Sequence, residues 1–580
     1  MVKSGPGQEA GLRCPSMRLF THKALNRAEV CRYNHSMVDE RIVVGDDQRP
    51  WRQQAEESLL LVAMEAWHGE SDVWLEAALP RLDETLRVNP LRRECDWVRQ
   101  RIEEMGGRAL GWVPNAYVMP WERGGAPADI KPLFNAFHET GRTTRQEAVS
   151  MLPPMMFDLN PEEIVLDMCA SPGSKSTHLA EILAGRGGVI ANDVSRSRTN
   201  TLVANAQRAS CSNLMIIQHD GRHVPRGTGQ GYDAVLVDAP CTGSATTRKN
   251  PDVWRKSQPS AGLELHKLQI SLLNRAIDVV RPGGTVVYST CSIDPVENEA
   301  VIARILEERD DVVSIQFEPS RTPGLIYRPG MDEWVVFDDD MEIISDGSGA
   351  PPHDPKIREE LGKCVRLLQQ DTGQGGFFFA ILQKNADAMM EIRPDARRII
   401  PNSKRKGIHP SIVSEETLDI IQTDHDPILS DASIWKRGKR ILWASQAMNK
   451  RVWDMDTNSR PDRIHLGKQW SPLNIIHVGV RGWEDRGGRN IRLSSEAMHS
   501  IPLGTEGERI HDVTPEALIR ILKQEEPAEN EQGYDSGGHI LRCEFDGVEW
   551  RLPVWVGERI TGMWKDTEAL ILLDRFKDVI

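Results

Sequence analysis

The stretch EIVLDMCASPGSKSTHLAEIL, residues 163–183, decides the fold. It opens with a short apolar run that ends at Asp167, as a buried strand does. A turn follows, and then a run of helix-forming residues. Ser171 is placed to cap this helix, and Pro172 to occupy its first position, where a proline costs no hydrogen bond. The stretch therefore predicts a strand, a tight turn and a helix, the repeating unit of an α/β fold.

The turn itself fits neither of two common nucleotide-binding motifs. A phosphate-binding loop ends in Gly-Lys-Ser/Thr, but here Ser174 separates Gly173 from Lys175, and the leading glycine is missing. The dinucleotide fingerprint needs three spaced glycines, and the turn does not have them. Gly173 still leaves room for a ligand to approach the backbone.

The same pattern of strand and helix continues along the chain. Its repetition predicts a parallel, doubly wound sheet covered by helices. We expect strands over 187–194, 214–220, 232–240, 285–292 and 373–384, and helices over 197–209 and 263–280.

Acidic residues close successive strands of this series. Asp193, Asp220 and Asp238 each stand at a strand end, and Asp193 lies 20 residues after Gly173, a spacing that suits an acid bound to ribose hydroxyls. Ligands of doubly wound folds bind at this edge of the sheet. S-adenosylmethionine fits, because it has a ribose, an adenine and a sulfonium but no phosphate. The alternative is that the aspartates cap helices.

Two cysteines follow neighbouring strands of the series, Cys241 in DAPC and Cys291 in STCS. Strands that pair lie about 4.8 Å apart, so both thiols would reach one pocket if these strands are adjacent. Free cysteines are more often buried and inert. A thiolate that adds to carbon 6 of cytosine, however, makes carbon 5 able to attack a methyl sulfonium. Lys175 would favour the thiolate and Asp238 would stabilise charge on ring nitrogen 3.

These residues alone leave open which cysteine attacks and which assists release. They do disfavour methylation of exocyclic amines, because those enzymes carry an aromatic residue where Cys241 stands.

Composition sets the broad class of protein. The chain has 580 residues and a formal net charge of −14, which predicts two to four domains and argues against a protein that coats nucleic acid indiscriminately. Nine scattered cysteines, an odd number, argue against a disulfide framework and a metal site, and favour a reducing, cytoplasmic setting. The sequence contains no run of eighteen apolar residues, so no membrane span is predicted.

Composition divides the chain into five expected regions and singles out three stretches within them. The stretch 317–372 is irregular and reads as an insertion or loop. Two basic clusters, 87–101 and 396–407, fit a solvated surface as well as a nucleic-acid contact. The regions are a disordered tail (1–20), a small α/β domain (21–125), the strand–helix domain (126–385), a linker (386–424) and a mostly β domain (425–580).

Several motifs, in this order, resemble the RNA cytosine-5 methyltransferases of the Nop/Sun (NSUN, RsmB-like) family, and most closely its tRNA-methylating branch. The resemblance implies a Rossmann-like methyltransferase domain preceded by a small RNA-binding domain. The C-terminal part weakly resembles PUA-like RNA-binding domains. The motifs include GRTTRQEAVSMLPPMM (141–156), LDMCASPGSK (166–175), VDAPCTG (237–243), RKNPDVW (248–254), YSTCSIDPVENEAVI (288–302) and GGFFFAILQK (375–384).

The resemblance also assigns roles to residues. It makes Cys291 the nucleophile, Cys241 the residue that assists release, and Lys175 and Asp238 the groups beside the target base. Arg145 and Arg248, within two of the motifs, are expected to contact RNA. Ser171 departs from the alanine usual in the family. The expected cofactor-binding residues are Cys169, Ala170, Ser171, Pro172, Gly173, Ser174, Lys175, Asp193, Asp220 and Asp238.

The resulting hypothesis is S-adenosylmethionine-dependent methylation of carbon 5 of cytosine in RNA, with tRNA as the expected substrate. It needs neither a metal nor a membrane, is compatible with a monomer, and fits the cytoplasm, or the nucleus of a eukaryote. The alternatives are an rRNA methyltransferase, a DNA methyltransferase that would attack through Cys241, and a non-catalytic RNA-binding assembly factor. The Glu-Asn-Val motif that accompanies the DNA enzymes is missing.

Overall fold

The computed structural model describes most of the chain. The tail at 1–20 and the basic cluster at 396–407 lie outside the described residues. The described residues are 50–226, 231–345, 347, 349–388, 410–430, 432–453, 473–487, 491–498, 501–504, 506–523 and 533–577.

A ten-stranded sheet forms the centre of the molecule, in the order β11-β14-β15-β9-β8-β5-β6-β7-β19, with β10 paired to β15. Five consecutive strands are parallel, and the order reverses between β5 and β8, where doubly wound sheets bind ligands. The predicted Rossmann-like fold is confirmed. The parallel strands are β5 (Ile164–Asp167), β6 (Gly188–Asn192), β7 (Leu214–Ile217), β8 (Tyr232–Asp238) and β9 (Val280–Thr290), and β15 (Phe377–Lys384) joins β9 antiparallel.

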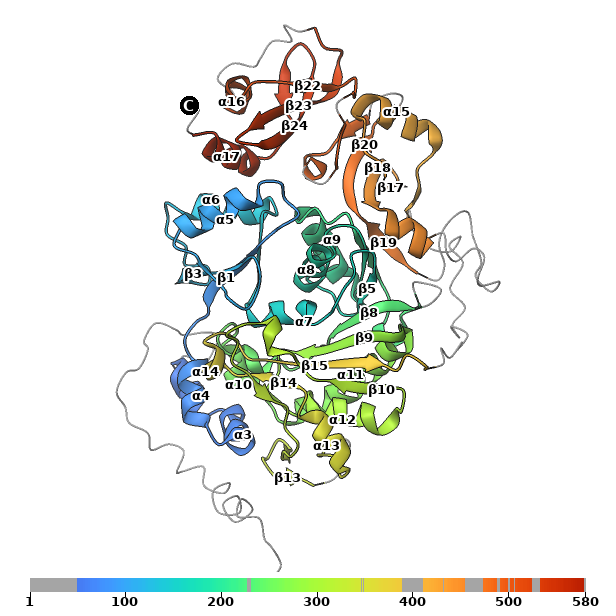
Figure 1. Cartoon of the computed structure of the whole chain (residues 1–580). Coiled ribbons are helices and arrows are strands. Elements are labelled where there is room, and N and C mark those ends of the chain that lie inside the picture. The colour runs from blue at the N-terminus through green and yellow to red at the C-terminus, as the bar shows by residue number, and fades with distance from the viewer. Residues whose placement is uncertain are drawn as a thin grey trace, which may run out of the picture.

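Both faces of this sheet are buried under helices (Figure 1). Successive side chains of β5 therefore enter opposite cores: Ile164 and Leu166 pack with one pair of helices, and Val165 packs with the other. The first pair is α11 (Ser260–Val279) and α12 (Glu299–Glu308), and the second is α8 (Ser174–Ile182) and α9 (Arg196–Arg208).

Helix α8 begins two residues later than its sequence predicts. Gly173 occupies the cap position with φ of 111°, so Ser171 is not the cap and Pro172 is not the first helical residue. A Cβ at Gly173 would lie 2.6 Å from Cδ1 of Leu202. The turn thus needs glycine both for its backbone conformation and for the close approach of α9.

The N-terminal part consists of two units rather than one small domain. Three helices pack against the central sheet domain and share a core with Trp254 and Ile293, and they lie away from the small sheet in Figure 1. The first two of these helices are separated at Ser58, whose hydroxyl caps the second helix and donates to the carbonyl oxygen of Trp254. The helices are α2 (Trp51–Glu56), α3 (Leu59–His68) and α4 (Ser71–Ala78).

The second unit is a four-stranded sheet, ordered β2-β3-β1-β4, with two helices. It extends past the boundary expected at residue 125, because β4 pairs with β1. Its elements are β1 (Asp83–Val88), α5 (Cys95–Glu104), β2 (Arg108–Ala109), β3 (Ala116–Glu122), α6 (Lys131–Glu139) and β4 (Thr143–Arg145).

The stretch 317–372 is not simply a loop. It supplies β14, which pairs with β15, and Val365 and Leu367 of this strand are buried in the core. The short elements here and nearby are β10 (Val312–Ile315), β11 (Arg328–Pro329), β12 (Val336–Phe337), β13 (Ile343–Ile344), α13 (Pro355–Leu361), β14 (Val365–Leu367) and α14 (Gln369–Thr372).

The C-terminal part contains a five-stranded and a four-stranded sheet. It is not a separate module, because β19 (Ile475–Val478) extends the central sheet by pairing with β7. The remaining elements are β16 (Ser411–Ile412), α15 (Glu415–His425), β17 (Ala432–Arg437), β18 (Arg440–Ser445), β20 (Val480–Asp485), β21 (Ile491–Leu493), β22 (Ile510–Asp512), α16 (Pro515–Lys523), β23 (Gly537–Phe545), β24 (Val548–Val556), β25 (Ile560–Gly562) and α17 (Asp566–Arg575).

The C-terminal part also holds the small sheet unit. Helix α17 lies beside α6 (Figure 1), and Glu568 of α17 accepts two hydrogen bonds from the buried Arg142, at 2.7 and 2.8 Å. Arg142 also forms an ion pair with the buried Glu94 at 2.8 Å. The first and last parts of the chain are therefore tied together by buried charges.

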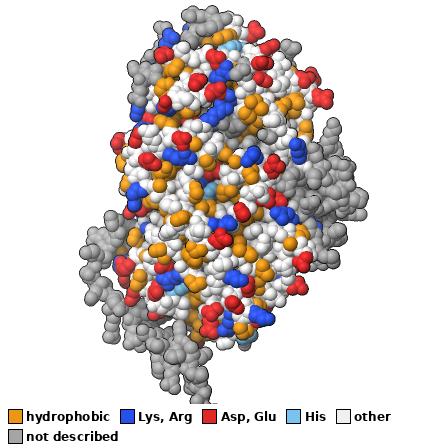
Figure 2. Space-filling view, viewed as in Figure 1, with side chains coloured by type: hydrophobic (Ala, Val, Ile, Leu, Met, Phe, Trp, Pro, Cys, Tyr) orange, Lys and Arg blue, Asp and Glu red, His pale blue; other side chains and the backbone are white. Residues whose placement is uncertain are grey.

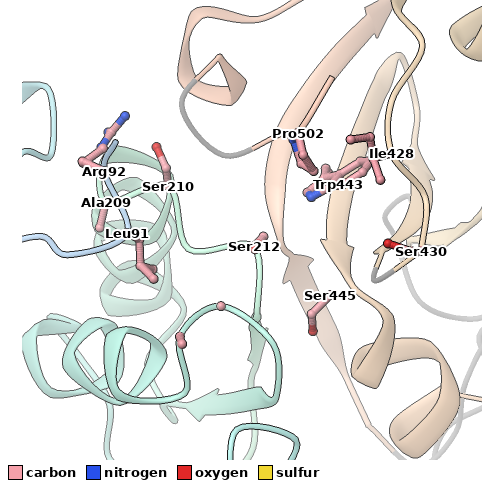
Figure 3. Close-up of a pocket in the computed structure, with 12 residues that line it drawn as sticks. Leu91, Arg92, Ala209, Ser210, Ser212, Ile428, Ser430, Trp443, Ser445 and Pro502 are labelled. Atoms are coloured by element: carbon pink, nitrogen blue, oxygen red, sulfur yellow. The ribbon is translucent and has the colours of Figure 1, made fainter. Parts of the chain in front are cut away.

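A crevice of about 230 Å³ marks the junction of these parts (Figure 3). Ser210 and Ser212, from the turn before β7, face Trp443 and Ser445 of β18 across it. This turn lies at the amino ends of the parallel strands, the edge opposite the strand-end acids. Within the part of the chain that the structure describes, no helix combines the length and apolar character needed to cross a membrane.

Candidate active site

A cavity of about 330 Å³ opens at the carboxyl ends of β5 and β8. The glycine turn, the cysteine strands and the small sheet unit all contribute to its wall. The lining includes Asp83, Glu84, Arg123, Arg145, Gln146, Glu147, Asp167, Cys169, Ala170, Ser171, Pro172, Ser174, Lys175, Asp238, Ala239, Thr246, Lys249, Cys291 and Phe377.

The two cysteines meet at this edge because β8 and β9 are adjacent and parallel. Their Sγ atoms are 3.4 Å apart. Cys291 lines the cavity, whereas Cys241 contacts Cys291 without being one of the lining residues. The hydrogen bond to Cys291, burial and the charge of Glu297 hold the pKa of the Cys241 thiol well above its usual range. This asymmetry leaves Cys291 as the sulfur that faces a ligand.

Lys175 supplies a partly buried positive charge beside Cys291. Its Nζ donates to Oδ2 of Asp238 at 2.7 Å, and Ser289 donates to Oδ1 of the same carboxylate at 2.9 Å. Burial alone would lower the pKa of Lys175, but the attraction of Asp238 outweighs it, with a further contribution from Cys291, so the pKa is raised. The ammonium stays charged and can stabilise a thiolate.

Glu297, which the sequence analysis did not select, fixes the loop that carries Cys241. This fully buried carboxylate accepts hydrogen bonds from the backbone N–H of Thr242 at 2.9 Å and its hydroxyl at 2.5 Å, and from the Gln269 amide at 3.0 Å. The only signal in the sequence was its place in the VENE motif after β9.

Asp167 has a carboxyl oxygen that could contact a cationic ligand. Its Oδ2 accepts a hydrogen bond from Ser176 at 2.6 Å, while its buried Oδ1 has no partner among the described residues. Burial raises the pKa of Asp167 to about 7, and the negative charge of Asp238 adds to the effect. S-adenosylmethionine has a sulfonium and an ammonium group, so an unpaired carboxylate oxygen in this cavity fits it.

The other two aspartates that follow strands, Asp193 and Asp220, are not among the residues that line the cavity. Asp193 is 3% exposed and accepts a hydrogen bond from the N–H of Ser195. Asp220 accepts hydrogen bonds from the guanidinium of Arg222, which lower the pKa of Asp220. Both follow neighbouring strands of the same sheet edge. Gly173 shapes the turn without lining the cavity.

The two arginines expected to contact RNA have different surroundings. Arg145 lines the cavity and donates to Asn135 at 2.5 Å. Arg248 instead joins the N-terminal helices to the sheet domain, donating to four carbonyl oxygens. These belong to Pro80, Arg81, Gly373 and Gln374. The structure therefore favours a structural role for Arg248 over contact with RNA.

Comparison with known proteins places this site in a family. The family model described as 16S rRNA methyltransferase RsmB/F matches residues 154–383. A multisite-specific tRNA:(cytosine-C(5))-methyltransferase of Schizosaccharomyces pombe is 33% identical over 503 residues, covering 70% of this chain and 72% of that protein. A ribosomal RNA small subunit methyltransferase F of Aliivibrio salmonicida is 34% identical over 442 residues, covering 72% of this chain and 91% of that protein.

A multisite-specific tRNA:(cytosine-C(5))-methyltransferase of Saccharomyces cerevisiae is 36% identical over 270 residues, covering 43% of this chain. The chain spans 40% of the length of this yeast relative. The family assignment rests on the matches to the Schizosaccharomyces pombe and Aliivibrio salmonicida proteins, and on the family-model match, which includes Cys241 and Cys291. The chain belongs to the RsmB/F (NSUN) family of S-adenosylmethionine-dependent RNA cytosine-5 methyltransferases.

Proposed function

We propose that this protein methylates carbon 5 of a cytosine in RNA, that tRNA is its substrate, and that Cys291 forms a covalent bond to the base. The observation that carries the proposal is the group of four side chains at one sheet edge. Cys291 and Cys241 lie 3.4 Å apart, and Lys175 pairs with Asp238 at 2.7 Å beside them.

Each step of this chemistry has a residue to perform it. The Cys291 thiolate, favoured by the Lys175 ammonium, adds to carbon 6 of cytosine and pushes electron density onto carbon 5. The Lys175–Asp238 pair supplies a proton donor and an acceptor for the edge of the ring that carries nitrogen 3. S-adenosylmethionine supplies the methyl group. Loss of the carbon-5 proton then restores the double bond as the bond between carbon 6 and sulfur breaks.

Cys241 is suited to assist this release. Its hydrogen bond to Cys291 and the charge there keep its thiol protonated before the reaction. Once the sulfur of Cys291 is bonded to the base, that sulfur no longer carries charge, so Cys241 ionises more readily. It can then act as a base near the ring, at the stage when a proton must leave.

Support for an RNA substrate comes from the family and from the cavity wall. The relatives from the two yeasts are named as tRNA enzymes. Arg123 and Lys249 line the cavity, and Arg145 joins them. Over the described residues of the face in Figure 2, both signs of charge are interspersed, so this face is not a continuous basic surface. Such a surface fits an enzyme that holds RNA locally.

An rRNA substrate is the second candidate, because the ribosomal RNA methyltransferase from Aliivibrio salmonicida is matched over 91% of its length. Bisulfite sequencing of total RNA from cells with and without the gene separates the two. A methylated cytosine lost from tRNA, and restored by the wild-type gene but not by Cys291→Ala, supports the proposal. A site lost only from rRNA selects the second candidate. No lost site in either RNA refutes the methyltransferase proposal.

A further inference from the structure

A second cavity, of about 350 Å³, lies on the other side of the segment that follows Cys241. The segment 242–250 forms the wall between the two cavities. Thr246 and Lys249 line the first, while Ser244 and Asn250 line the second. The two cavities are thus separated by the thickness of one stretch of chain.

Asp294 is an acidic residue that lines this second cavity. The residue is only 7% exposed, yet it lines the cavity. Its Oδ1 accepts a hydrogen bond from the N–H of Val296 at 2.9 Å, and no described residue donates to its Oδ2. Because no described residue occupies Oδ2, this oxygen can accept a hydrogen bond from a ligand in the cavity.

The surroundings of Asp294 favour its protonated carboxyl group, which can both donate and accept a hydrogen bond. Burial raises the pKa of Asp294 to about 8, and the carboxylates of Glu297 and Glu299 add to this effect, whereas Arg366 opposes it. A neutral carboxyl offers one donor and one acceptor side by side. That pair matches the hydrogen-bonding edge of a nucleobase, which also places donors beside acceptors.

The remainder of the wall combines polar residues, Glu264 among them, with an apolar side that suits a flat ring. Leu60 and Trp67 of helix α3 form one side, and Ala261 at the start of α11 contributes to another. Trp67 is an aromatic side chain of the kind on which bases stack. Lys256, 63% exposed and paired with Asp252 at 2.5 Å, adds a positive charge to the lining. A volume of about 350 Å³ is within the range of small-ligand sites, about 300–1,000 Å³.

We propose that this second cavity binds the nucleobase next to the target cytosine in the RNA chain, with Asp294 contacting its edge. The inference rests on the proposed function, because it takes the target base to lie beside Cys291. A flanking base held here would anchor the strand on both sides of the segment 242–250. It would also make the enzyme sensitive to a nucleotide that it does not modify.

Binding of short RNA tests the proposal without requiring turnover. The probe is a fluorescein-labelled, single-stranded 9-mer with cytosine at its centre. It is also made with an abasic nucleotide at the position before or after that cytosine. Affinity for the full chain is measured by fluorescence anisotropy with S-adenosylhomocysteine present. We expect one of the two abasic probes to bind about tenfold more weakly than the intact probe.

Three variants locate this effect. Asp294→Ala removes the polar contact and Ala261→Leu fills part of the cavity, so both should bind the intact 9-mer about tenfold more weakly and lose the sensitivity to the abasic nucleotide. Asp294→Asn keeps a donor and an acceptor and should behave like the wild type. Ala261 is half-buried, so its substitution keeps the test valid if Asp294→Ala does not fold.

Equal affinity of the wild type for all three probes would overturn the inference, and so would the absence of detectable binding by the wild type. The inference would also be wrong if both Asp294→Ala and Ala261→Leu kept the sensitivity to the abasic nucleotide. A chain that shows the expected binding pattern but methylates no RNA would refute the proposed function alone. A chain that methylates RNA with no dependence on either neighbour would refute this site alone.

Discussion

The protonation state of Asp167 should control the affinity for S-adenosylmethionine. Its pKa is raised to about 7 by burial, and its Oδ1 has no partner among the described residues. The carboxylate attracts the cationic cofactor, whereas the neutral acid does not. Affinity should therefore be highest above pH 7 and fall as the pH drops through 7.

The size of the effect follows from the titration. With a pKa of about 7, the fraction of Asp167 that is ionised falls about tenfold between pH 8 and pH 6. The dissociation constant should rise by about the same factor, and binding at pH 6 should release close to one proton, because the cofactor draws the ionised form. Isothermal titration calorimetry at both pH values, in buffers of different ionisation enthalpy, measures the affinity and the proton release.

Asp167→Asn is the matched control, because it keeps the shape of the side chain and an acceptor for Ser176. The α-amino group of the cofactor also titrates near these pH values, at about 7.7–8.0, but it does so equally with both proteins. The variant should bind more weakly than the wild type at pH 8 and should lack the additional loss at pH 6. An equal pH dependence in both proteins would refute the reasoning about Asp167.

Three further predictions concern other parts of the structure. Asp193→Ala should weaken cofactor binding at least about tenfold in calorimetry if Asp193 accepts hydrogen bonds from the ribose, and unchanged affinity would remove it from the site. Glu297→Ala should free the loop at Thr242, which should lower kcat at least about tenfold and leave the cofactor Kd unchanged. Glu297→Gln should lower kcat less. Equal kcat in the wild type and both variants would show that Glu297 does not hold the loop in its active position. Arg142→Met should lower the free energy of unfolding in urea by about 3–5 kcal/mol, because it removes the buried guanidinium that pairs with Glu568 and Glu94. A loss below about 1 kcal/mol would contradict this.

The central sheet could be predicted because its strands are buried on both faces. Such strands read as nearly continuous apolar runs, and β5 and β8 each end at an aspartate that marks the boundary. The pairing of β19 with β7 could not be predicted. An edge pairing uses backbone hydrogen bonds, and the four residues of β19 carry no mark of which strand they will meet.

The site could be predicted only in part, for a similar reason. Cys241 and Cys291 follow recognisable strands, so their proximity follows from strand adjacency. Glu297 and Asp294 lie after the same strand, but their roles depend on how the loop folds back over Thr242. Spacing along the chain does not encode that path, and the structure was needed to find both carboxyl groups.

The assignment of attack to Cys291 and release to Cys241 is tested most directly by trapping the covalent complex. Cys241→Ala is incubated with the RNA substrate and S-adenosylmethionine, denatured, and resolved on a gel, and the cross-linked peptide is identified by mass spectrometry. The account predicts a denaturant-resistant protein–RNA complex bonded through Cys291, and none with Cys291→Ala or with both cysteines replaced. A complex that accumulates instead in Cys291→Ala, bonded through Cys241, would contradict it.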